Sequence, residues 1–214
     1  MRGTSTSGRT RLSGEFYTAI QEPNVEVVTE RIERVEPEGI RTADGALHEL
    51  DVLVLATGFD AHAYMRPMQL VGPHDETLDD IWPDEPHGYL TVALPGFPNF
   101  FCLMGPHSPV GNQSLIAVAE TQADYALWFI KRFRVGGLAL AAPTATATER
   151  FNADLRAAMP DTVWTTGCHS WYIGADGLPM LWPWTPRRHR EMLAEPALAD
   201  FDVVGAPRPA GVGA

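Results

Sequence analysis

The sequence has few cysteines, no apolar leader and no long hydrophobic run. Cys102 and Cys168 are its two cysteines, too few for a disulfide framework and not spaced as a C-x-x-C redox pair, so we expect reduced thiols. The first residues, MRGTSTSGRTR, lack the apolar segment of a secretory signal, and no apolar stretch approaches the ~20 residues that cross a bilayer. These absences predict a cytoplasmic protein without a membrane span.

Positive charge is also scarce. The chain has 16 Lys and Arg against 27 Asp and Glu, a net charge of −11. Nucleic acid and anionic membrane surfaces are therefore excluded as expected partners, because their phosphates would be repelled. With 45% hydrophobic and 20% charged residues, the composition is that of a globular chain. Its 214 residues suffice for one sizeable core but are few for an enzyme that binds two dinucleotides.

The N-terminal quarter is dominated by β signals. A short helix over 15–20 is expected to precede a strand at 25–29. A meander should follow, with turns at Pro37-Glu38-Gly39 and Asp44-Gly45 and with strands at 32–35, 40–42 and 47–50. Residues 52–56 are apolar at every position, which predicts a central strand covered on both faces.

The rest of the chain alternates irregular and helical segments. Residues 60–98 lack a sustained period and predict a long excursion that lines a site or an interface, with a brief strand at 89–92. A strand at 100–104, a loop at 105–111 and a helix at 112–134 follow. The helix is expected to bury a stripe of Ile116, Ala119, Ala123, Ala126, Ile130 and Phe133. Thr146 and Glu149 predict a capping box for a second helix ending at Met159, and the tail from 205 is expected to be disordered.

Two places have the pattern of a ligand site. The strand ending at Ala56-Thr57-Gly58 would let the backbone approach a flat ligand closely, although a plain turn explains the same residues. The loop from Gly105 to Gly111 leads from a strand into a long helix. The free N–H groups of that helix would then lie where open α/β sheets bind ligands, or the loop is purely structural.

A third place, Val163 to Tyr172, is rich in aromatic residues. Its side chains suit either the wall of a pocket or a packed core. Cys168-His169, taken with Cys102 and His107, matches no zinc-ligand spacing, so no metal site is expected.

Taken together, these three stretches resemble a known enzyme family. Ala-Thr-Gly-Phe-Asp at 56–60, Gly-Pro-x-Ser-Pro-x-Gly-Asn at 105–112 and Trp-x-x-Gly-Cys-x-Ser-Trp-Tyr at 164–172 resemble the C-terminal half of class B flavoprotein monooxygenases. This group contains the Baeyer–Villiger and the flavin-containing monooxygenases. The resemblance runs from about Arg9 to Pro186. It implies an α/β fold: part of a three-layer, Rossmann-like FAD-binding domain, with a β-hairpin segment left from the NADP-binding domain.

The resemblance also implies domain limits and cofactor-binding residues. Residues 1–57 would be the remnant of the NADP-binding domain, residues 58–204 the C-terminal part of the FAD-binding domain, and residues 205–214 a disordered tail. Thr57, Gly58 and Phe59 would form the turn between the two domains. Gly105 and the helix start would face the pyrimidine side of the flavin, through Asn112, Gln113, Ser114 and Leu115.

Catalytic and substrate-lining residues are implied in the same way. Arg9 stands where Baeyer–Villiger members have the arginine of a Lys-Arg pair, whereas Gly8 replaces the lysine. A solvated arginine is the alternative for Arg9. The lining residues would be Trp164, Trp171, Tyr172 and Trp182. The implied reaction uses FAD and NADPH to form a flavin C4a-(hydro)peroxide, which oxygenates a ketone or a soft nitrogen or sulfur nucleophile.

Two motifs of the family are missing from the sequence. Neither G-x-G-x-x-G fingerprint is present, nor is the Phe-x-Gly-x-x-x-His motif, and the fingerprints are what cradle the FAD and NADP phosphates. We therefore expect the chain alone to bind neither cofactor tightly, and to pair with a complementary N-terminal half or with itself. Two alternatives stay open: a non-catalytic remnant or interaction module, and a disulfide reductase, which the distant cysteines disfavour.

Overall fold

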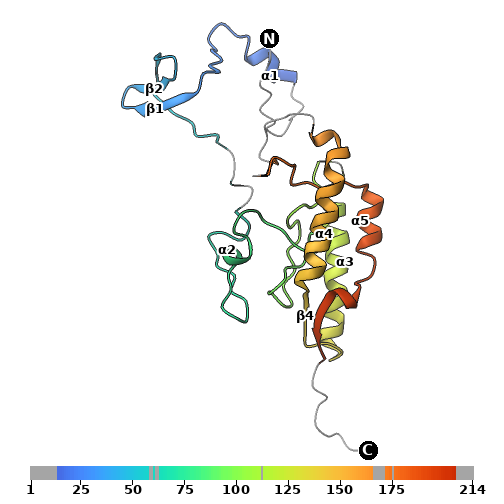
Figure 1. Cartoon of the computed structure of the whole chain (residues 1–214). Coiled ribbons are helices and arrows are strands. Elements are labelled where there is room, and N and C mark those ends of the chain that lie inside the picture. Colours follow the sequence, from blue (N-terminus) through green and yellow to red (C-terminus); the bar gives the residue numbers. More distant parts are fainter. Residues whose placement is uncertain are drawn as a thin grey trace, which may run out of the picture. The chain divides into compact units, whose positions relative to one another are not determined.

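The computed structural model describes residues 14–57, 60, 63–111, 113–165, 172–174 and 176–205. The chain divides into two compact units, one of residues 8–60 and one of residues 61–214 (Figure 1). This boundary lies near residue 57, where the sequence suggested a domain limit. We predict, as before, that the first unit derives from an NADP-binding domain and the second from an FAD-binding domain.

The first unit holds a short helix and a small meander. Helix α1 spans Gly14–Ala19, and strands β1 (Ile32–Glu36), β2 (Gly39–Thr42) and β3 (Leu47–Glu49) form an antiparallel sheet in the order β1-β2-β3. The first turn pairs Glu36 with Gly39. In the second, Asp44 accepts hydrogen bonds from the Ala46 N–H and the Thr42 hydroxyl. The prediction of this meander and of both turns is confirmed.

Two expected strands of the first unit are absent from the described residues. Residues 25–29 and 52–56 have no ladder partner, and the side chains of Val52 and Val54 are 75% and 78% exposed. A strand needs a neighbour to accept and donate its backbone hydrogen bonds, and none in the described chain pairs with these segments. The strand prediction for 52–56 was therefore wrong for this chain, although its apolar pattern is unmistakable.

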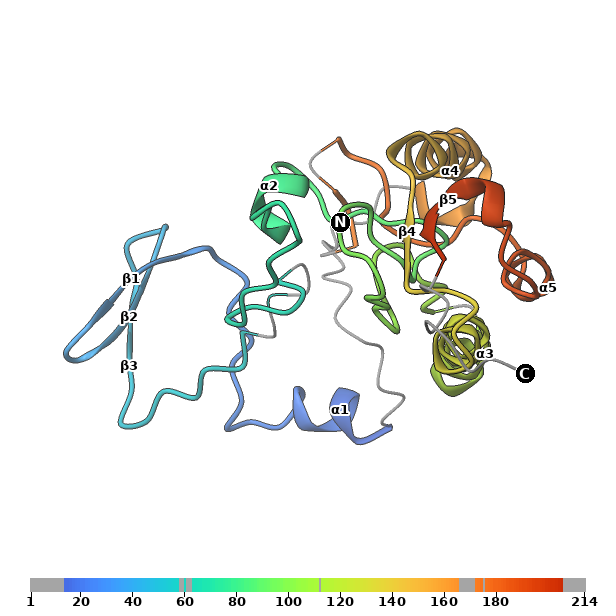
Figure 2. The same ribbon diagram turned by 90° about the horizontal axis from the view of Figure 1, so that it is seen from below.

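The second unit is built on three helices and a two-stranded sheet. Its helices α3 (Leu115–Arg134), α4 (Ala145–Ala158) and α5 (Pro186–Met192) run roughly alongside one another in Figure 1, and the β4–β5 pair lies between α3 and α4 in Figure 2. Strands β4 (Leu140–Pro143) and β5 (Phe201–Val204) pair antiparallel. The shorter helical segments are α2 (Leu78–Ile81), η1 (Met159–Asp161), η2 (Val163–Thr165) and η3 (Leu198–Asp200).

The helix predicted at 112–134 is present as α3, and its buried face overlaps the predicted stripe only in part: Ala126 is buried and Phe133 packs against the core, as predicted. The predicted stripe would bury Ile116 and Ile130, yet Ile116 is 73% exposed and Ile130 is exposed as well. The buried side chains are Val118, Gln122, Tyr125, Ala126 and Phe129. Two faces of this helix are apolar enough to satisfy the helical period, and the face with the large aromatic rings is the one that packs into the core.

Three further sequence predictions are corrected. The helix predicted to start at a Thr146–Glu149 box is instead capped by Thr144, whose hydroxyl accepts from the Ala147 N–H. The strands predicted at 89–92 and 100–104 are reduced to isolated bridges that join Ala93 to Tyr89 and to Phe101. Like 52–56, these segments have no continuous neighbour to pair with among the described residues.

The core of the second unit lies between the helices and the β4–β5 pair. Tyr125 and Phe129 of α3 meet Phe151 and Leu155 of α4, together with Trp182. The chain is mixed α/β, as predicted, and its described strands form small antiparallel sheets. Among the described helices, none has the length and apolar character that a membrane span requires.

Candidate functional site

The exposed start of α3 forms the centre of the candidate site. Ser114 adopts an extended conformation, and its hydroxyl accepts a hydrogen bond from the Ala117 N–H. The N–H groups of Leu115 and Ile116 lie in the first turn, where an α-helix offers them no acceptor. Because Ser114 to Ala117 are exposed, these donors and the positive end of a 20-residue helix face outward.

Gln113 adds a donor beside this helix start. Its amide Nε2 is buried, and no hydrogen-bond partner is present for it among the described residues. A buried amide without a partner costs free energy, so Gln113 can donate to an acceptor that lies beside it. Gln113 and Ser114 thus offer donors in sequence, next to Leu115. Asn112, the other residue predicted for this cluster, lies outside the described residues.

Gly105 begins the loop that leads to the helix start. A Cβ atom at this position would collide with the carbonyl oxygen of Thr91 and would lie 3.0 Å from that of Cys102. No larger residue fits there, which explains a glycine at a buried position. The backbone nearby is strained: Leu90, Thr91, Met104 and His107 all have φ between +50° and +66°. Left-handed non-glycine residues are costly and gather at functional sites.

The loop that carries the second sequence motif contacts the start of the third motif. Gly111 has a φ of +88°, and the ring of Trp164 lies against it. Trp164 itself stands on η2 and is half-buried. Tyr172 is also half-buried and packs at the edge of the main core. The structure therefore brings the predicted lining residue Trp164 to the loop before α3.

Other predicted residues are placed differently. Trp182 is 1% exposed and lies in the core, where its indole N–H donates to the Thr185 carbonyl and its ring contacts Trp184. It packs the core and lines no open surface. Thr57 is exposed and belongs to the other unit, so its proximity to the start of α3 stays a prediction. Arg9, Gly58, Phe59 and Trp171 lie outside the described residues.

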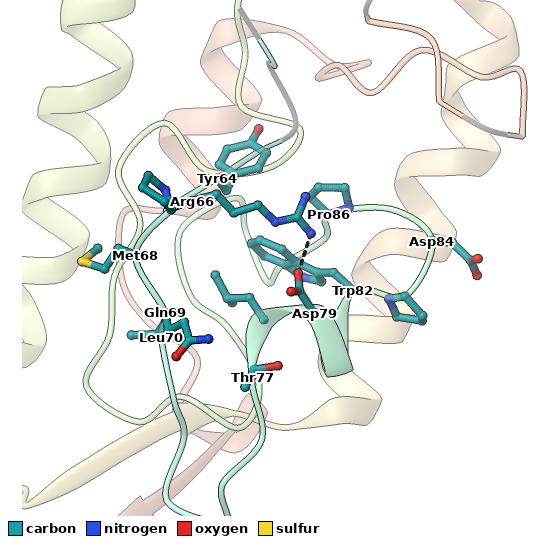
Figure 3. Close-up of a pocket in the computed structure, with 13 residues that line it drawn as sticks. Tyr64, Arg66, Met68, Gln69, Leu70, Thr77, Asp79, Trp82, Asp84 and Pro86 are labelled. Carbon is teal, nitrogen blue, oxygen red and sulfur yellow. Dashed lines mark hydrogen bonds and ion pairs between the residues drawn. The ribbon is translucent and has the colours of Figure 1, made fainter.

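A pocket of about 640 Å³ lies within the irregular excursion at 64–86 (Figure 3). Tyr64 and Trp82 meet edge to face at one side, with ring centroids 5.8 Å apart. The guanidinium of Arg66 and the carboxylate of Asp79, which also line the pocket, form an ion pair. Burial raises the pKa of Tyr64 to about 12, which keeps its hydroxyl protonated. The sequence predicted that this excursion lines a site or an interface, and the pocket is one place where a ligand could bind.

Comparison with known proteins places the chain in context. No protein-family model matches it. It is 56% identical over 192 residues to an uncharacterized monooxygenase of Mycobacterium tuberculosis, covering 90% of this chain and 39% of that protein. It is 34% identical over 209 residues to a Baeyer–Villiger monooxygenase of Streptomyces coelicolor, covering 96% and 40%.

Solved structures agree with these relatives. A closed crystal structure of cyclohexanone monooxygenase superposes with a TM-score of 0.78 at 31% identity, covering 91% of this chain and 38% of that one. The complex of OTEMO with FAD and NADP gives a TM-score of 0.78 at 28% identity, covering 92% and 38%. The chain is homologous to part of the flavoprotein monooxygenases. It spans about two fifths of the length of the curated relatives it matches.

The sequence analysis missed one residue of this site. Gln122 of α3 is fully buried, and its amide oxygen accepts a hydrogen bond from the Met104 N–H in the loop before the helix. A lone glutamine within an apolar helical stripe was the signal that could have found it. The predicted stripe did not include Gln122, although Gln122 lies at its edge, next to Ala126 and Phe133 around the helix.

Proposed function

We propose that this chain forms the part of an FAD- and NADPH-dependent monooxygenase that faces the flavin ring. One observation carries the proposal: the exposed, Ser114-capped start of α3 follows the tight turn at Gly105. The names of the relatives and the FAD and NADP in the OTEMO complex support it. A helix N-terminus favours negative charge by about 0.3–1 kcal/mol when exposed and by more when covered, which suits the electron-rich side of a reduced flavin.

The residues of this chain fit such a ring. Gln113 has a buried amide donor without a partner, and Leu115 follows with a backbone N–H that the helix leaves free. Both groups match the oxygen and nitrogen acceptors on the pyrimidine side of an isoalloxazine. The bare backbone at Gly105 and the turn at Thr57, Gly58 and Phe59 would let the polypeptide pass close to the ring plane.

The cofactors supply the redox chemistry, since flavin reduced by NADPH activates dioxygen. The protein's part is to bind, to orient and to stabilise charge. In this proposal Asn112 belongs to the cluster at the start of α3. Arg9 supplies a permanent positive charge near the reacting oxygen, which stabilises negative charge that develops there.

The substrate class of the proposal is a ketone, or else an amine or sulfide with a soft nucleophilic atom. Cyclohexanone in the name of a similar structure supports the ketone. Trp164 brings an aromatic surface to the loop before α3, and Tyr172 and Trp171 belong to the same stretch. Aromatic walls with few polar groups are typical of pockets for small apolar substrates.

A complementary polypeptide completes the proposed site. The chain has neither Gly-rich phosphate cradle, and its apolar segment 52–55 is exposed. A strand from another polypeptide would satisfy the backbone of that segment and cover its side chains. We propose a polypeptide that carries both cradles as this partner, with self-association as the behaviour of the chain alone.

Co-expression tests the proposal. The chain is produced alone and together with the polypeptide encoded upstream of it, provided that this carries both Gly-rich motifs. We expect the pair to co-purify with bound flavin and to consume NADPH faster when a cyclic ketone or a thioether is added. The chain alone should contain no flavin. A pair that binds flavin without any substrate-stimulated NADPH consumption would contradict the monooxygenase function.

The second candidate is a non-catalytic interaction module. The absence of both phosphate cradles from this sequence favours it. A stable pair that contains no flavin and consumes no NADPH would support this alternative and overturn the first.

A further inference from the structure

Gln122 is a polar side chain at the centre of an apolar helix face. It is 0% exposed, and it lies two turns beyond the Ser114 cap of α3. Its amide oxygen accepts a hydrogen bond of 2.7 Å from the Met104 N–H. Its Nε2 donates to the hydroxyls of Thr91 and Ser108, each at 2.9 Å. Both amide protons are thereby used.

The segments that Gln122 joins are far apart in sequence and conformationally strained. Thr91 has a φ of +66° and Met104 a φ of +57°. Each such residue costs on the order of 1–3 kcal/mol and persists only where its surroundings hold it. Gly105, the residue after Met104, has no room for a Cβ atom against the Thr91 carbonyl. A single side chain therefore holds two strained turns together.

Packing alone does not explain a glutamine here. An apolar residue of similar volume would fill the space without the free-energy cost of desolvating an amide. Well-formed hydrogen bonds must offset that cost. The neighbours Val118, Tyr125 and Phe129 form the apolar part of the same face. The amide fixes the position of the two loops relative to α3, because it forms hydrogen bonds with three defined atoms on them. One of those loops, 104–108, ends six residues before the Ser114 cap of α3.

We propose that Gln122 is a positioning residue for the cofactor-facing loop at 104–111. It sets the backbone of Met104 and the hydroxyl of Ser108 relative to α3, so that the loop and the helix start approach the flavin ring as one rigid surface. The inference deepens the proposed function and rests on it. Gln122 itself lies beneath the surface and does not touch the ring.

The first test uses the full chain and needs no cofactor. Cys102 is buried two residues before Met104, so its reaction with a thiol reagent reports opening of the loop. In a Cys168→Ser background, Gln122→Met and Gln122→Glu should each raise the labelling rate of Cys102 at least tenfold. The glutamate variant keeps the shape but loses the donors to Thr91 and Ser108.

Two controls separate positioning from general stability. Tyr125→Phe, on the same helix, removes a hydroxyl that has no partner among the described residues, and the labelling rate should be unchanged. Leu193→Ala, in the core just after α5, should lower the unfolding midpoint without a comparable rise in labelling. If Gln122→Met does not fold, Ser108→Ala removes one of its partners and should raise the rate at least threefold.

The second test uses the pair that binds flavin. Gln122→Glu should shift the absorbance maxima or the reduction potential of the bound flavin, whereas Tyr125→Phe should not. Equal labelling rates in the Gln122 variants and the wild type, or an unaltered flavin in Gln122→Glu, would overturn the inference. A wild-type pair without flavin would instead refute the proposed function. The labelling rates would still show whether Gln122 holds the loop, because they need no flavin.

Discussion

Gly111 lies directly against the ring of Trp164, so that a Cβ atom on Gly111 would stand 3.2 Å from Cη2 of the indole. This contact joins two stretches that are more than fifty residues apart in sequence. Trp164 stands on the 3-10 turn η2, and the contact places its ring beside the loop before α3. The aromatic wall of the proposed site thus depends on a glycine that no other residue replaces easily.

Gly111→Ala should therefore lower stability and disturb Trp164. Strain at a φ of +88° costs about 1–2 kcal/mol, and crowding of the indole adds to it. Gly177→Ala is the matched control, because Gly177 has a φ of +80° and open space around it. Urea unfolding should show the larger loss for Gly111→Ala. A change in tryptophan emission that disappears in the Trp164→Phe background should accompany only Gly111→Ala. Equal losses in the two variants would refute the contact.

His189 should make stability fall in mildly acidic solution. It is 0% exposed, its ring nitrogens have no hydrogen-bond partner among the described residues, and burial lowers its pKa to about 4. In the unfolded chain the histidine takes up a proton near pH 6.5, whereas in the folded chain it stays neutral until about pH 4. Stability is therefore lost as pH falls from about 6.5 to about 4.

This loss should total about 3.5 kcal/mol, since the pKa falls from 6.5 to about 4 and each pKa unit corresponds to about 1.4 kcal/mol. His189→Leu removes the titrating group, so its stability should be flat across that pH range. Unfolding midpoints at pH 7, 5.5 and 4.5 measure the effect, with the exposed His74→Leu as the control that keeps the slope. A parallel slope in His189→Leu would contradict the assignment.

Asp200 should make the stability of the fold depend on pH in a more acidic range than His189 does. Its carboxylate accepts the Tyr89 hydroxyl at 2.6 Å and pairs with the Arg150 guanidinium at 2.7 Å, and these partners hold its pKa below the usual value. A lowered folded pKa contributes stability above the unfolded pKa, near 4, that is lost as pH falls through the folded pKa.

Asp200→Asn should cost about 1–2 kcal/mol at pH 7, because the partly exposed Arg150 limits the ionic part. The difference from the wild type should shrink as the pH falls below about 4. Tyr89→Phe, which keeps the ion pair and removes one hydrogen bond, should cost less than Asp200→Asn in the same denaturant titration. A difference that stays constant down to pH 2 would count against this network.

The apolar segment at 52–55 should drive association of the isolated chain. Val52 and Val54 are more than two-thirds exposed, and unpaired backbone with apolar side chains is a template for strand addition. Val52→Lys with Val54→Lys should reduce the sedimentation coefficient toward that of a monomer, while Val135→Lys, at an equally exposed valine, should not. A wild-type chain that sediments as a monomer at all concentrations would contradict the prediction.

Local elements followed from the sequence where neighbouring residues supply all their partners. The meander of β1 to β3 is joined by short turns, and the hydrogen bonds of α3 and α4 run within each helix. The family resemblance, carried by three motifs, also needed only the order of residues. Both kinds of information are contained in short stretches of sequence.

Other features depended on contacts that the sequence does not display. The strand pattern at 52–56 finds no ladder among the described residues, and β4 pairs with β5 although some sixty residues separate them. Which face of α3 is buried, and hence the role of Gln122, was decided by aromatic packing and by hydrogen bonds to Thr91 and Ser108. The sequence by itself determined the local elements and the kinship, because these depend on near neighbours. Only the tertiary structure decided the pairing, the buried face and the strained loop, because these depend on groups that are distant along the chain and meet only after folding.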